Sequence, residues 1–314
     1  PNLVGKNVYD VLGVHQNLPP VIISDAIEAV VMDQSCDVVL LATDSYTEAS
    51  YKKIMWLLNK KVNVISTAEE MAYPQAKSPH LAKEMDALAK ANKVTLLGTG
   101  VNPGMMMDLL VVCLTGVCED VESIDVARVN SLSPFGKTVM DEQGVGLSIE
   151  DYHEKNNKGK IAGHVGFYES ISMINDALGL NSNRFDQTME PIITKTDRKS
   201  PFGFAKENHV CGVHMKAFAY ENDDLKISMS HPQQIEPHLA GVNTGDYITI
   251  KGSPEVNMAI QPEVDGGIGT IAMCVNMIPH VINAKPGLKT MIDLPVPRAI
   301  CGDVRTMIED EIND

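Results

Sequence analysis

The chain has 314 residues and a formal net charge of -15 at pH 7, and its length suits two domains better than one. The acidic balance argues against nucleic-acid binding. No apolar run is long enough to span a membrane and no signal peptide opens the chain, so we expect a cytoplasmic protein.

Strands and helices alternate over the first third of the chain. The opening segment 1–18 resembles a loop that follows a strand, and Ser24 is expected to cap the first helix. Near-continuous apolar runs are typical of parallel strands, which are buried on both faces. We predict such strands at 37–43, 62–67 and 94–97, and helices over 25–32, 46–60 and 78–92. This alternation indicates a doubly wound parallel sheet with right-handed crossovers.

The third of these strands runs into a glycine-rich turn. Gly98, Gly100 and Gly104 nearly reproduce the phosphate-binding pattern G-x-G-x-x-G, but with one residue too many. Because this strand comes late in the sheet, we interpret the turn as facing the reactive end of a ligand and not its pyrophosphate. Asn102 is expected to cap the following apolar helix, with Pro103 in its first turn.

A complete dinucleotide-binding domain begins with a strand, a glycine-rich turn, a helix and a second strand. The second strand ends in the residue that distinguishes a ribose hydroxyl from a phosphate. Neither strand precedes the predicted units, so we expect the chain to be truncated at its amino end; the alternative is an incomplete cofactor site. The choice between NAD and NADP therefore stays open.

The pattern changes after a helix that ends near Gly116. An alternating run at 121–131 predicts a strand, Ser148 opens a helix, and another helix is expected over 164–178. Antiparallel strands follow up to residue 260, with a hairpin turn at 222–224, and glycines 266, 267 and 269 open a last helix over 270–282. The expected domains are a Rossmann-type dinucleotide-binding domain lacking its first βαβ unit (1–119), an α+β substrate-binding and dimerisation domain with a mainly antiparallel open sheet (120–284), and a C-terminal tail (285–314).

Polar residues follow the carboxyl ends of two successive predicted strands, where parallel sheets bind ligands. They are Ala42 to Ser45 and Ser66 to Glu70. We expect these segments to meet Asn102 and Gly104 in one crevice. Asp44, Ser45 and Glu69 could equally cap the following helices. A desolvated carboxylate in such a crevice can take a proton from an ammonium or a water, so Glu69 and Glu70 are candidate bases.

No motif predicts a metal centre. The six cysteines are scattered without a C-x-x-C pair, and we interpret them as reduced thiols. Methionines 105 to 107 are interpreted as core residues.

Six segments in order resemble the family of 2,4-diaminopentanoate dehydrogenases and native amine dehydrogenases, whose fold is similar to the dihydrodipicolinate reductase group. They are LLATDS, STAEEMAYP, GTGVNPGMMMD, DVARVNSLSPFGKTVM, GHVGFYES and SMSHP, and they extend over nearly the whole chain. The resemblance implies oxidative deamination of a 2,4-diamino acid at C4, with NAD or NADP as cofactor. It also implies a small-molecule diamino acid or amine as substrate and a homodimer formed through the second domain.

The resemblance also implies roles for individual residues. The base falls on Glu69 or Glu70. Arg128 and Asn130 leave one face of a strand, and Arg128 can fork a substrate carboxylate through two hydrogen bonds. His164, His231 and Thr270 fall in the substrate pocket. The residues that border the cofactor are Ala42, Thr43, Asp44, Ser66, Thr67, Asn102, Pro103 and Gly104.

Other readings remain open at this point. A lone strand arginine is usually part of a surface ion pair, and His164 and His231 can be ordinary helix-end and sheet-edge residues. A dihydrodipicolinate-type reductase or a diaminopimelate dehydrogenase shares the architecture, although the paired basic motif expected of the reductase is missing. A non-catalytic binding module is the reading if the first βαβ unit is absent from the natural protein.

Overall fold

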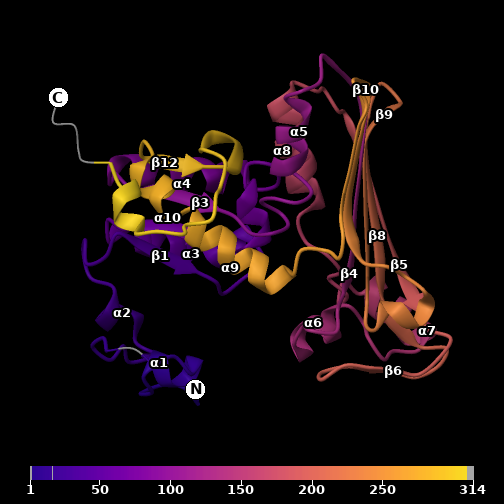
Figure 1. Cartoon of the computed structure of the whole chain (residues 1–314), viewed down its shortest axis with the longest axis horizontal. Coiled ribbons are helices and arrows are strands. Elements are labelled where there is room, and N and C mark those ends of the chain that lie inside the picture. The colour runs from indigo at the N-terminus through magenta and orange to yellow at the C-terminus, as the bar shows by residue number, and fades with distance from the viewer. Residues whose placement is uncertain (1, 16, 310–314) are drawn as a thin grey trace.

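The computed structural model describes residues 2–15 and 17–309, which form two lobes joined side by side (Figure 1). The first lobe contains a four-stranded parallel sheet in the order β1-β2-β3-β12. Its strands are β1 (Val38–Leu41), β2 (Asn63–Ser66), β3 (Thr95–Gly98) and β12 (Gly287–Lys289). The predicted parallel sheet is confirmed. The segment predicted as a tail contributes β12, a three-residue strand too short to give a sequence signal, while residues 310–314 of that segment lie outside the described part.

Helices cover both faces of this sheet, as expected of a doubly wound fold. Val64 and Leu96 pack with α3 and α4, whereas Ile65 and Leu97 pack with α9 and α10. The bounds are α3 (Thr47–Asn59), the 3-10 turn η1 (Glu69–Ala72), α4 (Pro79–Ala91), α9 (Gly266–Asn276) and α10 (Ile278–Asn283). The predicted single helix over 270–282 is thus two helices, because Pro279 has no N–H with which to continue α9.

The amino-terminal segment extends away from the first lobe (Figure 1). It contains α1 (Val8–Leu12), within the segment interpreted as a loop, and α2 (Ile27–Val30). Residues 1 and 16 of the predicted loop lie outside the described part. The expected helix over 25–32 is shorter than predicted, and the prediction that Ser24 caps it is wrong: Ala26 is the N-cap, and the Ser24 hydroxyl accepts the Ala26 N–H before the helix begins.

The second lobe is built on a six-stranded sheet in the order β11-β10-β4-β9-β8-β5. Its neighbouring strands are antiparallel except β4 and β9, which pair in parallel. The α5 and α8 helices pack on the face turned toward the first lobe (Figure 1). The bounds are β4 (Asp120–Ser131), β5 (Arg184–Ile193), β8 (Val210–Glu221), β9 (Asp224–Gln234), β10 (Gly245–Ser253), β11 (Val256–Ile260), α5 (Leu109–Thr115) and α8 (Phe167–Leu178).

The fold also contains smaller elements. They are α6 (Lys137–Glu142), α7 (Ile149–Asn157), β6 (Arg198–Lys199), β7 (Phe204–Ala205) and the 3-10 turn η2 (Pro237–Ala240), while η3 (Met291–Asp293) and η4 (Val304–Met307) follow β12. Of these, α6, α7 and β6 lie near the lower end of the six-stranded sheet in Figure 1. Ser148 caps α7 by accepting the Asp151 N–H, as predicted. Within residues 2–15 and 17–309, no helix combines the length and apolarity needed to cross a bilayer.

Candidate active site

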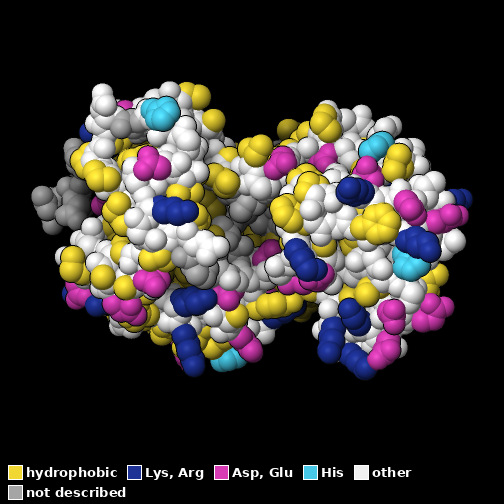
Figure 2. Space-filling view, turned by 90° about the horizontal axis from the view of Figure 1, so that it is seen from below, with side chains coloured by type: hydrophobic (Ala, Val, Ile, Leu, Met, Phe, Trp, Pro, Cys, Tyr) yellow, Lys and Arg dark blue, Asp and Glu magenta, His cyan; other side chains and the backbone are white. Residues whose placement is uncertain are grey.

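The two lobes meet around a cavity of about 190 Å³, and the space-filling view shows the hollow between them (Figure 2). One side of the cavity lies at the carboxyl ends of β1, β2 and β3, where a parallel sheet binds ligands. The other side is formed by β4 and β9 of the second lobe. Seven predicted site residues line this single cavity: Glu69, Asn102, Arg128, Asn130, His164, His231 and Thr270.

The second-lobe wall arises from a change of polarity along one face of the sheet. On β4, the inward positions change from Ile124 and Val126, in the core, to Arg128 and Asn130 at the cavity. On β9, Met229 is in the same core, and the next inward positions are His231 and Gln233. Side chains two positions apart on a strand share a face. The inward positions therefore keep their alternation, but they change from apolar residues in the core to polar residues at the cavity.

Arg128 is buried beneath this wall and is already engaged by the protein. Its Nη1 donates to Asp246 Oδ1 over 2.5 Å, and its Nη2 donates to the Val264 carbonyl over 2.6 Å. Asp246 also accepts the Val264 N–H through its second oxygen. Asp246 and the Val264 carbonyl therefore already occupy part of the guanidinium that was expected to hold a substrate carboxylate through two hydrogen bonds. The remaining N–H groups of Arg128 can donate to a substrate.

Two uncharged histidines stand together in the cavity. The His164 and His231 rings meet edge to face with centroids 4.8 Å apart. The His231 Nδ1 donates to the Arg128 carbonyl over 2.6 Å, which leaves Nε2 as an acceptor in the neutral ring. Burial, followed by the charges of Arg128 and Lys77, lowers the pKa of His164 to about 3. Burial and the neighbouring His164 likewise hold the pKa of His231 well below its usual value.

The glycine-rich turn brings Asn102 to the cavity, and a buried aspartate fixes the turn. Asp108 accepts hydrogen bonds from the Gly104 N–H at 2.8 Å, the Leu109 N–H at 2.7 Å and the Ser170 hydroxyl at 2.9 Å. The prediction that Asn102 caps the next helix is wrong: α5 begins at Leu109, with Asp108 as its cap. Gly104 has a φ of +127°, which is incompatible with a helix, so the chain becomes helical only after it.

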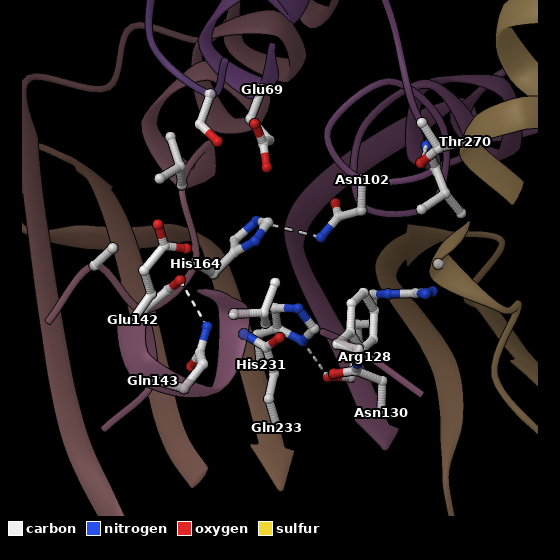
Figure 3. A pocket seen from close by; sticks show the side chains of 18 of the residues that line it. Glu69, Asn102, Arg128, Asn130, Glu142, Gln143, His164, His231, Gln233 and Thr270 are labelled. Atoms are coloured by element: carbon white, nitrogen blue, oxygen red, sulfur yellow. Dashed lines mark hydrogen bonds between the residues drawn. The ribbon is translucent and has the colours of Figure 1, made fainter. Parts of the chain in front are cut away.

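Asn102 connects the turn to His164. Its Nδ2 lies 3.3 Å from His164 Nε2, and its Oδ1 is buried without a hydrogen-bond partner. In Figure 3, the Glu69 and Asn102 side chains point toward His164 from the first-lobe side, and Arg128 and Asn130 lie across the cavity. Asn130 Oδ1, Gln143 Oε1 and Gln233 Nε2 are also buried without partners, so four polar side-chain atoms of the described cavity residues are left unsatisfied.

The two adjacent glutamates lie in different surroundings. Glu69 lines the cavity, whereas Glu70 turns inward, where its Oε2 accepts the Thr47 N–H over 2.9 Å. Burial raises the pKa of Glu69, and the carboxylates of Glu142 and Glu70 add to this rise. Of the two candidate bases, Glu69 is therefore the one that faces the cavity.

A second cavity of about 510 Å³ adjoins the first and shares Glu69, Asn102 and Thr270 with it. Most of the predicted cofactor residues line it: Ala42, Thr43, Asp44, Thr67, Asn102 and Pro103. Ser66 and Gly104 do not. Ser66 is fully buried beneath the surface and its hydroxyl accepts the Ala68 N–H, while Gly104 supports the turn from behind.

The sequence assigned no site role to several residues that line the substrate-side cavity, among them Tyr46, Glu142, Gln143 and Gln233, whereas Ser45 lies at the cavity as expected of its segment. Gln233 follows His231 by two positions on one strand, so the alternation alone could have found it. Glu142 and Gln143 come from α6 and its end, and nothing in their spacing predicts a place at the cavity.

A Rossmann-type sheet whose carboxyl edge opens onto a polar cavity shared with a second lobe is the arrangement typical of dinucleotide-binding dehydrogenases. Residues 105–310 of the chain match the family model of the 2,4-diaminopentanoate dehydrogenase C-terminal domain. The curated 2,4-diaminopentanoate dehydrogenase of Acetoanaerobium sticklandii is 57% identical over 310 residues, which cover 98% of this chain and 88% of the relative. The chain belongs to the 2,4-diaminopentanoate dehydrogenase family.

A solved structure agrees with this fold. The amine dehydrogenase from Mycobacterium smegmatis superimposes with a TM-score of 0.84, covering 96% of this chain and 88% of that one at 23% identity. The expected fold class, with a Rossmann-type domain and a second domain with a mainly antiparallel sheet, is confirmed.

Proposed function

We propose that this protein catalyses the reversible, NAD(P)-dependent oxidative deamination of 2,4-diaminopentanoate at C4, which yields 2-amino-4-oxopentanoate and ammonia. The observation that carries the proposal is Glu69, a desolvated carboxylate on the border between the cofactor-side and substrate-side cavities. The 57% identity to a curated enzyme of that name supports the choice of substrate.

The cofactor-side cavity suits a nicotinamide. Asn102 Oδ1 is a buried acceptor without a partner, which the N–H of a carboxamide would satisfy. Thr43, Thr67 and Pro103 would border the ring. A bound nicotinamide supplies the acceptor for the hydride that leaves C4.

Glu69 would serve the proton transfers. An ammonium cannot release a hydride from its carbon, so the C4 amine must first lose a proton, and a neighbouring carboxylate can accept it. Once this proton has passed to solvent, the ionised carboxylate can take a proton from the water that attacks the iminium carbon and return it to the nitrogen that leaves as ammonia. Burial raises the pKa of Glu69, which makes its carboxylate a stronger proton acceptor than an exposed one.

The α-amino acid end of the substrate would lie against β4 and β9. The free N–H groups of Arg128 and the unpartnered Gln233 Nε2 are donors for a carboxylate, and Asn130 Oδ1 is an acceptor for an ammonium. His164 and His231 are neutral there and add no positive charge that would repel a diamine. Binding the α-amino acid end at this wall would place C4 of the substrate, and not C2, next to the nicotinamide ring.

The test is a spectrophotometric assay of nicotinamide reduction on protein with its natural amino terminus, with NAD and NADP in separate reactions. We expect reduction with 2,4-diaminopentanoate and none with meso-diaminopimelate. Reduction with meso-diaminopimelate alone would keep the fold and refute the substrate. The same assay assigns the cofactor preference.

We also propose a cytoplasmic homodimer. The α5 and α8 helices cover one face of the six-stranded sheet, which supports pairing of two chains through the other face (Figure 1). Sedimentation at micromolar concentration should give twice the chain mass, and a monomer mass would contradict this.

A further inference from the structure

Two buried carboxylates and one partly exposed lysine form an ion cluster that includes Glu70, the neighbour of Glu69 in η1. Lys77 Nζ lies 3.3 Å from Glu70 Oε1 and 3.2 Å from Glu169 Oε1. Glu169 is 0% exposed and Glu70 is 8% exposed, whereas the Lys77 side chain is 43% exposed, so two buried carboxylates share one ammonium that reaches the solvent. We call Glu70, Lys77 and Glu169 the Lys77 cluster.

Stability alone gives little reason for such a group. Taking the Glu70 and Glu169 carboxylates out of water costs several kcal/mol per ion, and apolar replacements of buried ionic groups are often neutral or stabilising. The placement of the cluster is more informative. It joins η1, which carries Glu69, to the segment before α4 and to α8.

Glu70 is anchored at both of its carboxylate oxygens. Oε2 accepts the Thr47 N–H at the beginning of α3, and Oε1 faces Lys77. Successive residues of a 3-10 turn point about 120° apart, because it has about three residues per turn. Holding Glu70 inward therefore directs Glu69 toward the cavity.

The α8 helix belongs to the second lobe, because its apolar face packs on the six-stranded sheet. Its Glu169 contacts Lys77, and two turns later its Asp176 accepts a hydrogen bond from the Tyr73 hydroxyl at the end of η1. The turn that bears Glu69 is thus held against the lobe that forms the opposite wall of the cavity.

We infer that the Lys77 cluster positions the Glu69 carboxylate against the second-lobe wall, which makes Glu70, Lys77 and Glu169 positioning residues of the reaction. The inference rests on the proposed function only in naming Glu69 as the base. The cluster also acts on Glu69 through its charge, since Glu70 opposes ionisation of Glu69 and Lys77 offsets Glu70. The other titratable groups around Glu69 are Tyr46 before α3, Glu142 of α6 and His164 before α8.

The test compares Glu70→Gln, Lys77→Met and the double variant by the pH dependence of kcat/KM for 2,4-diaminopentanoate. Glu70→Gln keeps an acceptor for Thr47 and removes a negative charge, so the acidic limb moves to lower pH. Lys77→Met leaves Glu70 unopposed, so the limb moves to higher pH. Each shift should be about 0.5 to 1 pH unit, and the double variant should return close to the unmodified enzyme.

Lys77→Met should also lower kcat about tenfold to a hundredfold with little change in KM, and Lys77→Arg should restore most of it. The matched control is Lys90→Met, which removes an exposed lysine that pairs with Asp86 in α4. It should change neither value. If the acidic limb of the kcat/KM profile moves in neither Glu70→Gln nor Lys77→Met, the inference is overturned. If Lys77→Met fails to fold, Glu70→Gln decides alone: a limb at lower pH supports the positioning role and an unmoved limb refutes it.

Amide hydrogen exchange separates this inference from the proposed function. Peptides covering 67–73 should exchange faster in Lys77→Met than in Lys90→Met, whatever the substrate. If the unmodified enzyme leaves 2,4-diaminopentanoate unchanged, the proposed function fails, and the exchange result still decides on the cluster. Equal exchange in the two variants would refute positioning.

Discussion

Arg128 and Asp246 lie directly opposite each other on the antiparallel strands β4 and β10, and their side chains form an ion pair of 2.5 Å that is almost wholly buried. Asp246 neutralises the arginine and also holds the Val264 N–H. The cavity wall thus keeps a guanidinium in a fixed place without leaving a bare positive charge to meet a diamine.

Removing Asp246 should destabilise the protein strongly. Asp246→Ala leaves the Arg128 guanidinium buried without its counter-ion, and we expect the free energy of unfolding to fall by about 3 to 5 kcal/mol. Chemical denaturation at neutral pH measures this. The control is Asp141→Ala, which breaks an exposed pair with Lys137 and should leave the denaturation midpoint unchanged. Equal midpoints for the two variants would contradict the account.

Glu69 and Glu70 should differ in their effect on turnover. Glu69→Gln removes the group that faces the cavity, and kcat should fall by about 10²- to 10⁴-fold with KM nearly unchanged. Glu70→Gln keeps the hydrogen bond to Thr47 and should retain most of the turnover at the pH optimum. Initial rates at saturating substrate make the comparison. If Glu70→Gln is the inactive variant, the assignment of the base is wrong.

His164 should make the folded state sensitive to acid. Its pKa is about 3 in the fold against an ordinary value of 6.5, so below 6.5 the unfolded chain binds a proton that the native protein does not. Stability is therefore lost as the pH falls from 6.5 toward 3, with no contribution above that window. His231 acts in the same direction.

The variant His164→Gln should lose less stability than the unmodified protein when the pH is lowered from about 7 to about 5. Urea midpoints at the two pH values measure the difference. His153→Gln, at an exposed position of α7, is the matched control and should follow the unmodified protein. An identical acid sensitivity in His164→Gln would show that another group dominates.

Asp108 should matter for both stability and activity. Asn at this position has one acceptor oxygen where the carboxylate has two, so one of the Gly104, Leu109 and Ser170 donors loses its partner. We expect Asp108→Asn to lower the free energy of unfolding by about 1 to 3 kcal/mol and to reduce kcat, because the turn carries Asn102. Ser170→Ala, which removes only one donor, should cost about 1 kcal/mol. Thermal unfolding and initial rates measure these effects.

Periodic features were the most predictable from the sequence. The alternation of β4 placed Arg128 and Asn130 on one face, and the buried runs located the strands of the first sheet. Choosing between Glu69 and Glu70 needed the structure, because a single 3-10 turn has no periodicity to extend. The beginning of α5 was misplaced since Asn102 and Pro103 have the residue types of a helix start, while Gly104 and Asp108 decide the backbone.

Non-local contacts were not predictable in the same way. The partner of Arg128 lies 118 residues away on β10, and Lys77 meets Glu169 across the lobes. Sequence spacing carries no record of such pairs. Gln233 is the exception, because it continues the alternation that begins with Met229 and His231.

The most direct test of the central claim is the fate of a deuterium label. We expect 2,4-diaminopentanoate labelled with deuterium at C4 to transfer the label to the nicotinamide ring, as detected by mass spectrometry of the reduced cofactor. Substrate labelled at C2 should give an unlabelled reduced cofactor. Transfer from C2 and not from C4 would contradict both the proposed reaction and the orientation of the substrate against β4 and β9.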